Sequence, residues 1–584
     1  MKDVAFLFLL LGAMNVVCFL PHYLLNFPER PNPAESLLSR RAAESRGIRL
    51  LYTKLPYSDP LRINFDFSVA VFVTVWAGWQ GTGAQLALTA LFLFGVINVI
   101  YVGLMQSVFK RPPVLGSDLS LLKTGLSIMR RWIIQGLIAL LVVLGILGLL
   151  AFETLAIMLQ LNLKGNPIAL MAAAALLPSC LLNLFKYDYR LIIYRTVYSP
   201  VLHLLRNFEV GREQRRFINE ESDYFAGLNQ HQPLSLVNPP NIVILCIESY
   251  GGVVYRDSDM LSQLQERLDA LESQIRASGL HVASVMSVAP LFSGGSWLSY
   301  TTFTYGLKVD NVVVHDRLFA PGSGFSAYDS LFHVLGRSGY QNVLLCPLGG
   351  VPKSNVDWDA IQRNFQADVM IDFESLAYVG PRLPYLGNHT RYAPLDQYAL
   401  NAAYTSTRAR AQQPFTLFYL TLNSHHPYNS PLTTSADWQS LNTPDTEVCM
   451  SAELGSNLRV RFICAMRYQL EMFTRFLADN ADDHTVFVVF GDHQPPMVAQ
   501  EDMGTATPVH VISRHEGLVS AFVAGGYTLG LRPKTSEGAL TRHEDFMALM
   551  LSAMREQYGQ TSSPNLEPAA GKTDSPEDSP KHAS

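Results

Sequence analysis

Five apolar runs with almost no charged side chains lie within the first 185 residues. This feature limits the possible folds of the chain more than any other. The runs cover residues 4–21, 67–79, 85–109, 133–159 and 167–185. A helix needs about 20 apolar residues to cross the hydrocarbon core of a membrane. We therefore predict a polytopic α-helical membrane domain of about five helices over residues 1–185. The second run is short, and a re-entrant segment there would leave four spans.

The first run is predicted to stay in the protein as a helix. Lys2 is its only early cation, and residues 22–26 lack the small-residue cleavage site of a signal peptide. The composition agrees with a membrane protein, because charged residues make up only 16% of the chain. The formal net charge of -5 is small and gives no reason to expect a nucleic-acid partner.

Beyond residue 185 the sequence changes character. Residues 187–208 mix Arg, Tyr and Leu at helical spacing, which is typical of an amphipathic segment on a membrane surface; a solvated connector helix is the alternative. We assign residues 186–240 to an amphipathic juxtamembrane linker and residues 241–558 to a separate folded domain. Residues 559–584 are rich in Ser, Pro and charge without periodicity and are predicted to be a disordered tail.

Short apolar strands alternate with helices from residue 241 onward. The expected strands cover residues 242–247, 342–346, 415–422, 485–490 and 509–512. The expected helices cover residues 260–278, 327–338, 394–411, 460–480 and 543–558. Buried Val- and Ile-rich strands alternating with helices indicate an α/β domain whose mainly parallel sheet is covered on both faces.

Polar side chains with metal-binding chemistry follow three of these strands. Glu248 ends the first, His425 follows the third, and the pair Asp492-His493 follows the fourth. Each has a structural alternative as a cap, a turn residue or a structural histidine. In open α/β sheets ligands bind outside the carboxyl ends of the strands, so these groups are expected to converge. Together with a hydroxyl they form a shell for one divalent cation, with Mn²⁺ or Mg²⁺ favoured and Zn²⁺ as the alternative.

Residues 241–558 resemble the sulfatase branch of the alkaline-phosphatase superfamily, and within it the membrane-anchored phosphoglycerol and phosphoethanolamine transferases of the lipoteichoic acid synthase type. The resemblance rests on Ile-Glu-Ser at Glu248, Gly-Asp-His at 491–493 and His-His-Pro-Tyr at 425–428. It implies that Glu248, Asp492 and His493 bind metal. It also implies that His425 contacts the substrate, with His426 as the alternative.

The nucleophile position departs from the sulfatase pattern. Sulfatases carry Cys-x-Pro-Ser-Arg, with a Gly ten residues after the Cys; here Ser296 precedes Gly306 by ten residues. Leu298 and Tyr300 replace the Pro and Arg of the signature that directs conversion to formylglycine. The resemblance therefore implies an unmodified Ser296 that is both nucleophile and metal ligand, with Ser299 as the alternative nucleophile.

Four further residues are weaker candidates for the site. Trp358 and Arg363 lie where related transferases place contacts to the phosphoryl or head group; a surface helix is the alternative. His510 and His515 suggest a second metal, but the strand pattern around them favours structural roles.

The resemblance implies a transferase that moves phosphoglycerol or phosphoethanolamine from a membrane phospholipid to a glycan or lipid acceptor through a phospho-serine intermediate. A sulfuric-ester hydrolase or phosphodiesterase with the same ligands is the first alternative. A non-catalytic membrane regulator on a sulfatase-like fold is the second, although such a protein would be expected to have lost ligands.

The membrane orientation rests on conflicting signals. Basic residues crowd the segments before the second and fourth runs: Arg30, Arg40, Arg41, Arg46, Arg49, Lys54, Arg62, Lys110, Arg111, Lys123, Arg130 and Arg131. The positive-inside bias would place these segments, and with five spans residues 241–558, in the cytoplasm. Lipid donors and envelope acceptors of the resembled family are used outside. We favour a bacterial cytoplasmic (inner) membrane protein with an external catalytic domain. There Cys449 and Cys464 would either pair or remain free thiols.

Overall fold

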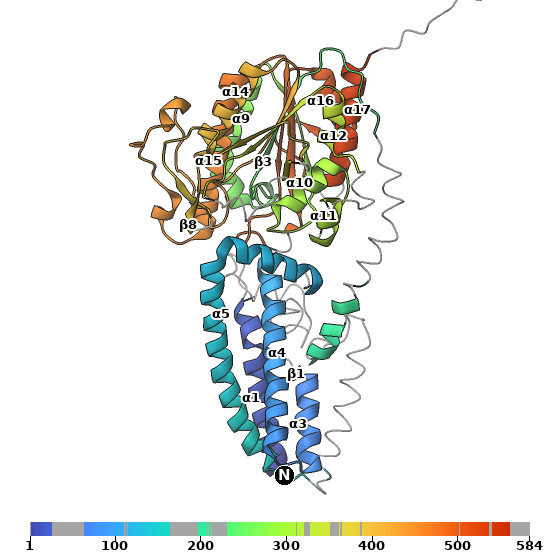
Figure 1. Ribbon diagram of the computed structural model, residues 1–584, viewed down its shortest axis with the longest axis vertical. Helices are drawn as coiled ribbons and strands as arrows, with labels where there is room; N and C mark the ends of the chain where they lie inside the picture. The colour runs from blue at the N-terminus through green and yellow to red at the C-terminus, as the bar shows by residue number, and fades with distance from the viewer. Residues whose placement is uncertain are drawn as a thin grey trace, which may run out of the picture.

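The computed structural model describes residues 2–25, 63–109, 113, 115–163, 167, 197–205, 207–209, 212, 231–310, 312–319, 328–350, 361–362, 365–385, 388–500, 503–535 and 540–560. Two regions make up this part of the chain: an N-terminal group of long helices and an α/β region at one end of it (Figure 1).

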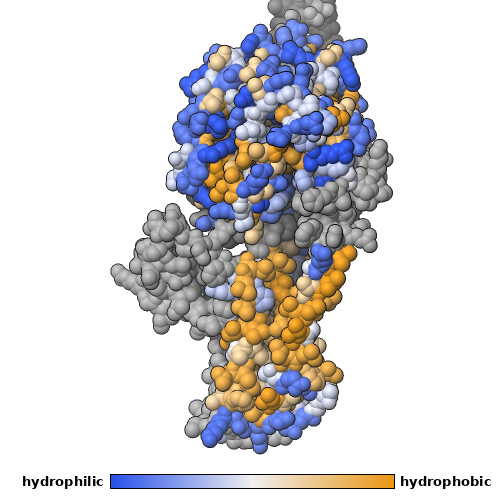
Figure 2. All heavy atoms as spheres, turned by 90° about the vertical axis from the view of Figure 1, so that its left-hand side faces the viewer, coloured by the Kyte–Doolittle hydropathy of each residue, from blue (hydrophilic) through white to orange (hydrophobic). Residues whose placement is uncertain are grey.

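Four apolar helices form the first region: α1 (Lys2–Leu25), α3 (Phe65–Ala77), α4 (Thr82–Phe109) and α5 (Leu115–Leu159). Among the described residues, three helical segments are long and apolar enough to cross a membrane: Lys2–Leu25, Thr82–Met105 and Ile134–Leu159. Helix α3 is shorter. The predicted fifth run lies outside the described residues except for residue 167. Figure 2 shows an apolar surface over these helices and a mainly hydrophilic one over the α/β region.

The linker returns to the helical region at the start of α3. Strand β2 (Val197–Tyr198) pairs in parallel with β1 (Ile63–Asn64). The Ser199 hydroxyl donates to Asp66 at 2.8 Å, and the Val201 amide donates to the same carboxylate at 2.9 Å. This part of the predicted amphipathic linker is therefore held against the helices by main-chain and side-chain hydrogen bonds.

The α/β region is built on a nine-stranded mixed sheet within the described residues. Five neighbouring strands run parallel: β10 (Thr485–Gly491), β3 (Asn241–Ile247), β9 (Phe415–Leu420), β5 (Gln341–Cys346) and β6 (Val369–Asp372). Beyond β10 lie β11 (Ala506–Ser513), β4 (His281–Val288), β12 (Thr528–Leu529) and β13 (Leu540–Arg542). Strands β11 and β12 are antiparallel to their neighbours and β13 is parallel to β4. The predicted mostly parallel sheet is confirmed.

Alternate residues of β3 contribute to two different cores. Val243, Leu245 and Ile247 pack in one cluster with α9 (Ser258–Ala277), α14 (Asp396–Arg410) and α15 (Leu458–Asn480). The intervening residues pack in a second cluster with α10 (Ser296–Tyr305), α12 (Leu331–Arg337), α16 (Glu516–Ala524) and α17 (Phe546–Tyr558). Figure 1 shows the two helix groups on opposite sides of β3. A strand covered on both faces explains the uninterrupted apolar run of its sequence.

Cys449 and Cys464 are free thiols in the structure. Cys449 is exposed on a loop, whereas Cys464 is buried on α15. Of the two alternatives at these positions, the structure has the unpaired one.

Candidate active site

Two neighbouring parallel strands deliver the acidic groups of the site. Ile247 at the end of β3 lies opposite Gly491 at the end of β10, so the following residues, Glu248 and Asp492, leave the sheet side by side. Gly491 permits this approach, because a Cβ there would lie 1.9 Å from the Tyr250 carbonyl oxygen. Adjacent parallel strands thus bring two residues that are far apart in sequence to one point.

Glu248, Asp492 and His493 form a buried cluster. His493 Nε2 lies 3.2 Å from Asp492 Oδ2 and 3.5 Å from Glu248 Oε1. The side chains are 3%, 0% and 2% exposed for Glu248, Asp492 and His493. Their ligand atoms all lie within 4.8 Å of one another. Two carboxylates held this close without water are costly unless a cation or a proton is shared among them.

Hydrogen bonds from the backbone orient the cluster. The amides of Ser249 and His493 donate to Asp492 Oδ1 at 2.7 and 2.8 Å. His493 Nδ1 lies 2.9 Å from the Gln494 carbonyl oxygen, which requires the proton on Nδ1 and leaves the Nε2 lone pair facing the carboxylates. Asp492 Oδ2 is buried and has no hydrogen-bond donor among the described residues. The lone pairs of His493 Nε2 and Asp492 Oδ2 therefore face each other, as they would around a divalent cation.

The pKa values of the two groups reflect the same crowding. Burial, reinforced by the Glu248 carboxylate, raises the pKa of Asp492 to about 7. Burial by itself would lower the pKa of His493, but the Asp492 and Glu248 carboxylates together hold it above its ordinary value. The donor set of two carboxylates, one imidazole and one hydroxyl fits one divalent cation.

Ser296 is the first residue of α10 and sits at the edge of this cluster. Its hydroxyl donates to Glu248 Oε2 at 3.0 Å and lies 3.3 Å from His493 Nε2. Gly294 and Gly295 have φ angles of 67° and 72°, a left-handed turn that an L side chain rarely adopts. Helix α10 ends at Tyr305 and is capped by Gly306, so the ten-residue spacing in the sequence is the length of this helix. A helix N-terminus at this position favours a negatively charged group beside the Ser296 hydroxyl.

Ser299, the alternative nucleophile, has a different environment. It is fully buried, and its hydroxyl donates to the main-chain carbonyl of Asp492. Ser296, by contrast, is partly exposed above the buried cluster. Ser299 therefore ties α10 to the turn that carries the ligands, and Ser296 is the hydroxyl that an incoming group can reach.

The segment after β9 is fastened to the Glu248 main chain. The Glu248 amide donates to Thr421 Oγ1 at 3.1 Å, and the Ser424 hydroxyl donates to the Glu248 carbonyl at 2.8 Å. These contacts place His425 beside the cluster. His425 Nδ1 lies 2.7 Å from the His426 carbonyl oxygen, and its ring is 4.9 Å from that of Tyr385. Burial lowers the pKa of His425 to about 4.

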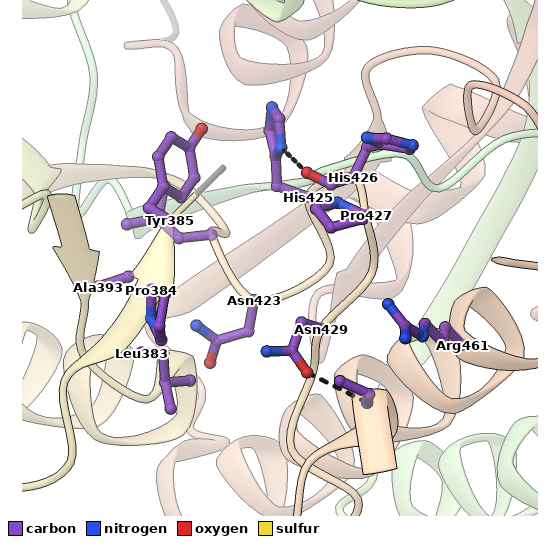
Figure 3. Close-up of a pocket in the computed structure, with 12 residues that line it drawn as sticks. Leu383, Pro384, Tyr385, Ala393, Asn423, His425, His426, Pro427, Asn429 and Arg461 are labelled. Atoms are coloured by element: carbon purple, nitrogen blue, oxygen red, sulfur yellow. Dashed lines mark hydrogen bonds between the residues drawn. The ribbon is translucent and has the colours of Figure 1, made fainter. Parts of the chain in front are cut away.

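His425 and His426 line a cavity of about 110 Å³ next to the cluster. The other residues around it are Leu383, Pro384, Tyr385, Ala393, Leu422, Asn423, Pro427, Asn429, Ala452 and Arg461. They come from β7 (Leu383–Tyr385), the end of β8 (Asn388–Ala393), the loop after β9, η6 (Ser451–Leu454) and α15. Figure 3 shows them arranged around this space, with His425 and His426 on one side and Arg461 reaching in from α15.

The remaining sequence candidates fall elsewhere. Trp358 and Arg363 lie outside the described residues. His510 Nδ1 is 2.7 Å from Ser284 Oγ and His515 accepts from the Leu518 amide as the cap of α16, so both make structural contacts.

Sequence reasoning missed several residues that shape the site. Ser249 donates to Glu248 Oε1 at 3.0 Å, and its position directly after a candidate ligand was a usable signal. His543 is buried, and its Nε2 lies 3.3 Å from the carbonyl oxygen of Gly491 at the end of β10. Tyr385 and Arg461 carry no local motif.

The family model described as Sulfatase matches residues 240–552. Lipoteichoic acid synthase LtaP from Listeria monocytogenes matches at 14% identity over 56% of this chain and 76% of that one, with a TM-score of 0.32. The soluble domain of lipooligosaccharide phosphoethanolamine transferase A from Neisseria meningitidis matches at 12% identity, over 56% and 94% of the two chains, with a TM-score of 0.34. Phosphoglycerol transferase GacH from Streptococcus pyogenes matches at 10% identity, over 58% and 79%, with a TM-score of 0.32. No curated protein sequence matches the chain.

Proposed function

Because the chain belongs to the sulfatase family, whose enzymes are phosphotransferases or hydrolases, we propose that it is a membrane-bound, metal-dependent transferase. It would move a phosphoglycerol or phosphoethanolamine group from a phospholipid to a glycan or lipid acceptor of the cell envelope. One observation carries the proposal: the partly exposed Ser296 hydroxyl lies 3.0 Å from Glu248 at a helix start, above the buried carboxylate–histidine cluster. A serine without the sulfatase maturation signature suits phosphoryl chemistry.

Glu248, Asp492, His493 and Ser296 are the residues that would hold the cation. A bound divalent cation would lower the pKa of the serine hydroxyl and offset the charge of the transferring phosphoryl group. The oxygen-rich set favours Mn²⁺ or Mg²⁺, and the single histidine also suits Zn²⁺.

In the first step Ser296 Oγ attacks the phosphorus atom of the phosphodiester. The hydroxyl proton passes toward Glu248 Oε2, to which it is already hydrogen-bonded at 3.0 Å. The bond between phosphorus and the lipid oxygen breaks, and that oxygen takes a proton and leaves as diacylglycerol. The phosphoryl head group remains on Ser296.

In the second step an acceptor hydroxyl attacks the phospho-serine and displaces Ser296 Oγ. The proton lost by the acceptor balances the one taken up by Ser296. His425 suits this transfer, because its Nδ1 faces the His426 carbonyl and its Nε2 carries a lone pair. The lowered pKa of His425 keeps the imidazole neutral and able to accept a proton at neutral pH.

The apolar helices supply the route to the donor. Figure 1 places β8, which borders the cavity, at the end of the α/β region that faces the helices. Helix α11 (Val312–Phe319), which packs near the nucleophile helix, also contacts α5. The proposed location is the bacterial inner membrane, with the catalytic domain outside. Alkaline phosphatase or a fluorescent reporter fused after Phe208 tests this: phosphatase activity is expected, and fluorescence alone contradicts an external domain.

The decisive experiment is lipid analysis of cells that carry the intact protein or Ser296→Ala, with Ser299→Ala as the matched control. Diacylglycerol is expected to accumulate with the intact protein and not with Ser296→Ala. Release of the head group to water without a modified acceptor would assign the protein as a phosphodiesterase. An identical lipid profile in both strains contradicts the proposal.

A further inference from the structure

The cavity beside His425 has an uneven charge. Among the described residues, one guanidinium, that of Arg461, lines it, and no carboxylate does. The other polar side chains around it are those of Tyr385, Asn423, His425, His426 and Asn429. A small pocket with one unbalanced cation selects its ligand by charge as well as by shape.

Arg461 is held in place but not neutralised. Its Nε donates to the Gly455 carbonyl at 2.7 Å, which fixes the side chain. In the part of the chain that the structure describes, no carboxylate lies within ion-pair distance of it. Two other arginines of α15 do form ion pairs with carboxylates: Arg459 with Asp257 at 2.8 Å and Arg475 with Glu471 at 3.2 Å.

Asp396, a buried acid beside the loop after β9, is already satisfied by the protein. Asp396 does not line the cavity, and its carboxylate accepts four hydrogen bonds. The donors are the Tyr419 hydroxyl at 2.6 Å, the Leu422 amide at 3.0 Å, the Asn423 amide at 2.9 Å and Gln469 Nε2 at 2.6 Å. Asp396 therefore holds the loop after β9 in place and offers no acceptor to a ligand.

The other lining groups add donors and an apolar wall. Asn429 Oδ1 accepts from the Ala452 amide at 3.2 Å, which leaves its NH₂ group as a donor without a partner among the described residues. Burial lowers the pKa values of His425 and His426 to about 4, so neither carries charge at neutral pH. The Tyr385 ring against His425 provides a flat face.

The cavity is small. Its volume is about 110 Å³. A head group of three carbons fits this space better than a sugar ring. The cavity also adjoins the nucleophile cluster through His425, which is where the donor's head group would lie during attack.

We propose that this cavity binds the donor's head group and that Arg461 makes it select the hydroxyl-rich glycerol group over an ammonium group. The inference rests on the proposed phospholipid transfer and names phosphatidylglycerol as the donor class. Glycerol hydroxyls accept hydrogen bonds from Arg461 and Asn429. An ethanolamine ammonium would meet the guanidinium with no carboxylate among the residues that line the cavity, and like charges placed together disfavour the wrong ligand.

The test uses the full-length protein in detergent micelles with Mn²⁺ and fluorescent phosphatidylglycerol or phosphatidylethanolamine. The measured quantity is diacylglycerol release that disappears in Ser296→Ala. We expect phosphatidylglycerol to react at least about tenfold faster. Arg461→Gln should raise KM for phosphatidylglycerol and bring the ratio of the two rates toward one. Arg461→Glu should make phosphatidylethanolamine the faster substrate. Arg461→Lys should keep the preference.

Arg410→Gln is the matched control, because Arg410 is exposed at the far end of α14. It should leave the ratio unchanged. Equal use of the two lipids, or a ratio that Arg461→Gln does not alter, overturns the inference while Ser296-dependent release still supports the transferase. If neither lipid releases diacylglycerol, the phospholipid transferase itself is contradicted. In that case thermal stabilisation of Mn²⁺-loaded protein by sn-glycerol phosphate but not phosphoethanolamine, lost in Arg461→Gln, still supports the pocket; no difference between the two probes overturns it.

Discussion

The buried cluster of Glu248, Asp492 and His493 and the cavity lined by Arg461 have opposite electrostatic character. In the cluster two buried carboxylates face one imidazole, and Asp492 Oδ2 lacks a donor among the described residues. In the cavity a guanidinium has no carboxylate partner in the described part of the chain. The cluster therefore favours a cation or a shared proton, and the cavity is proposed to favour a ligand rich in hydrogen-bond acceptors.

This difference suggests how the proposed phospholipid donor could bind, with one part at the cluster and another in the cavity. A phospholipid head group offers both complements: a phosphoryl group for the cation side and hydroxyls for the guanidinium side. His425 separates the two environments and is uncharged at neutral pH, so it does not cancel either one. Experiments that alter one environment and leave the other intact test whether the division holds.

Replacement of Ser296 is expected to have the largest effect. Ser296→Ala should lower total diacylglycerol release by about 10³-fold or more, because the phosphoryl group then has no covalent acceptor. The measurement is kcat with the preferred lipid. Ser299→Ala should lower it far less, since that hydroxyl contacts only a main-chain carbonyl in the cluster. The reverse order would make Ser299 the nucleophile.

Replacement of Asp492 should remove the metal and spare the cavity. Asp492→Asn is expected to weaken Mn²⁺ binding by about 100-fold or more, because a neutral amide replaces a buried anionic ligand. Calorimetric titration of the purified protein measures this. Asp259→Asn is the control, as its side chain is 68% exposed on the surface. Unchanged Mn²⁺ affinity in Asp492→Asn would remove Asp492 from the ligand set.

Metal affinity should also depend on pH. In the metal-free cluster the pKa of Asp492 is raised to about 7 and that of His493 is also raised. Below these pKa values protons occupy the sites that the metal needs. Affinity should therefore rise with pH through about 7, by about tenfold per pH unit for each proton displaced. Titrations at pH 6, 7 and 8 measure the Mn²⁺ affinity. An affinity that does not change with pH would contradict competition between protons and the metal for Asp492 and His493.

Replacement of Asp396 should act on the cavity side and have the smallest effect on turnover. Asp396→Asn keeps the shape but turns an amide donor toward groups that already donate. We expect a loss of about 1–3 kcal/mol in the free energy of unfolding and a higher KM for the donor lipid. Asp483→Asn, which removes an exposed partner of Arg514, should leave the free energy of unfolding nearly unchanged. If Asp396→Asn lowers the Mn²⁺ affinity instead, the cavity and the Glu248–Asp492–His493 cluster cannot be altered independently.

Most of the cluster was accessible from the sequence because its residues end strands or begin a helix. Glu248 and Asp492 each follow an apolar run, and parallel strands put such residues at one edge. Strand β4 was missed because His281, Ser284 and Ser287 interrupt its apolar pattern. Strand β11 was predicted as a strand, but the local pattern does not report its direction, which is antiparallel to β10.

The cavity had no comparable signal. Tyr385, Asn429 and Arg461 come from β7, a loop and α15, and none of them stands in a motif. An unpaired arginine is recognised only when the positions of all nearby carboxylates are known.

The sequence by itself determined a lipid-facing N-terminal region, a mostly parallel α/β domain and the identity of the metal-binding candidates, because hydrophobic periodicity and strand ends are local properties. Only the tertiary structure decided that Ser296, and not Ser299, faces the open side of the cluster. It alone decided that Arg461 lines the same cavity as His425 and has no carboxylate partner in the described part of the chain. Charge balance and exposure depend on contacts between distant segments, and these exist only after the chain has folded.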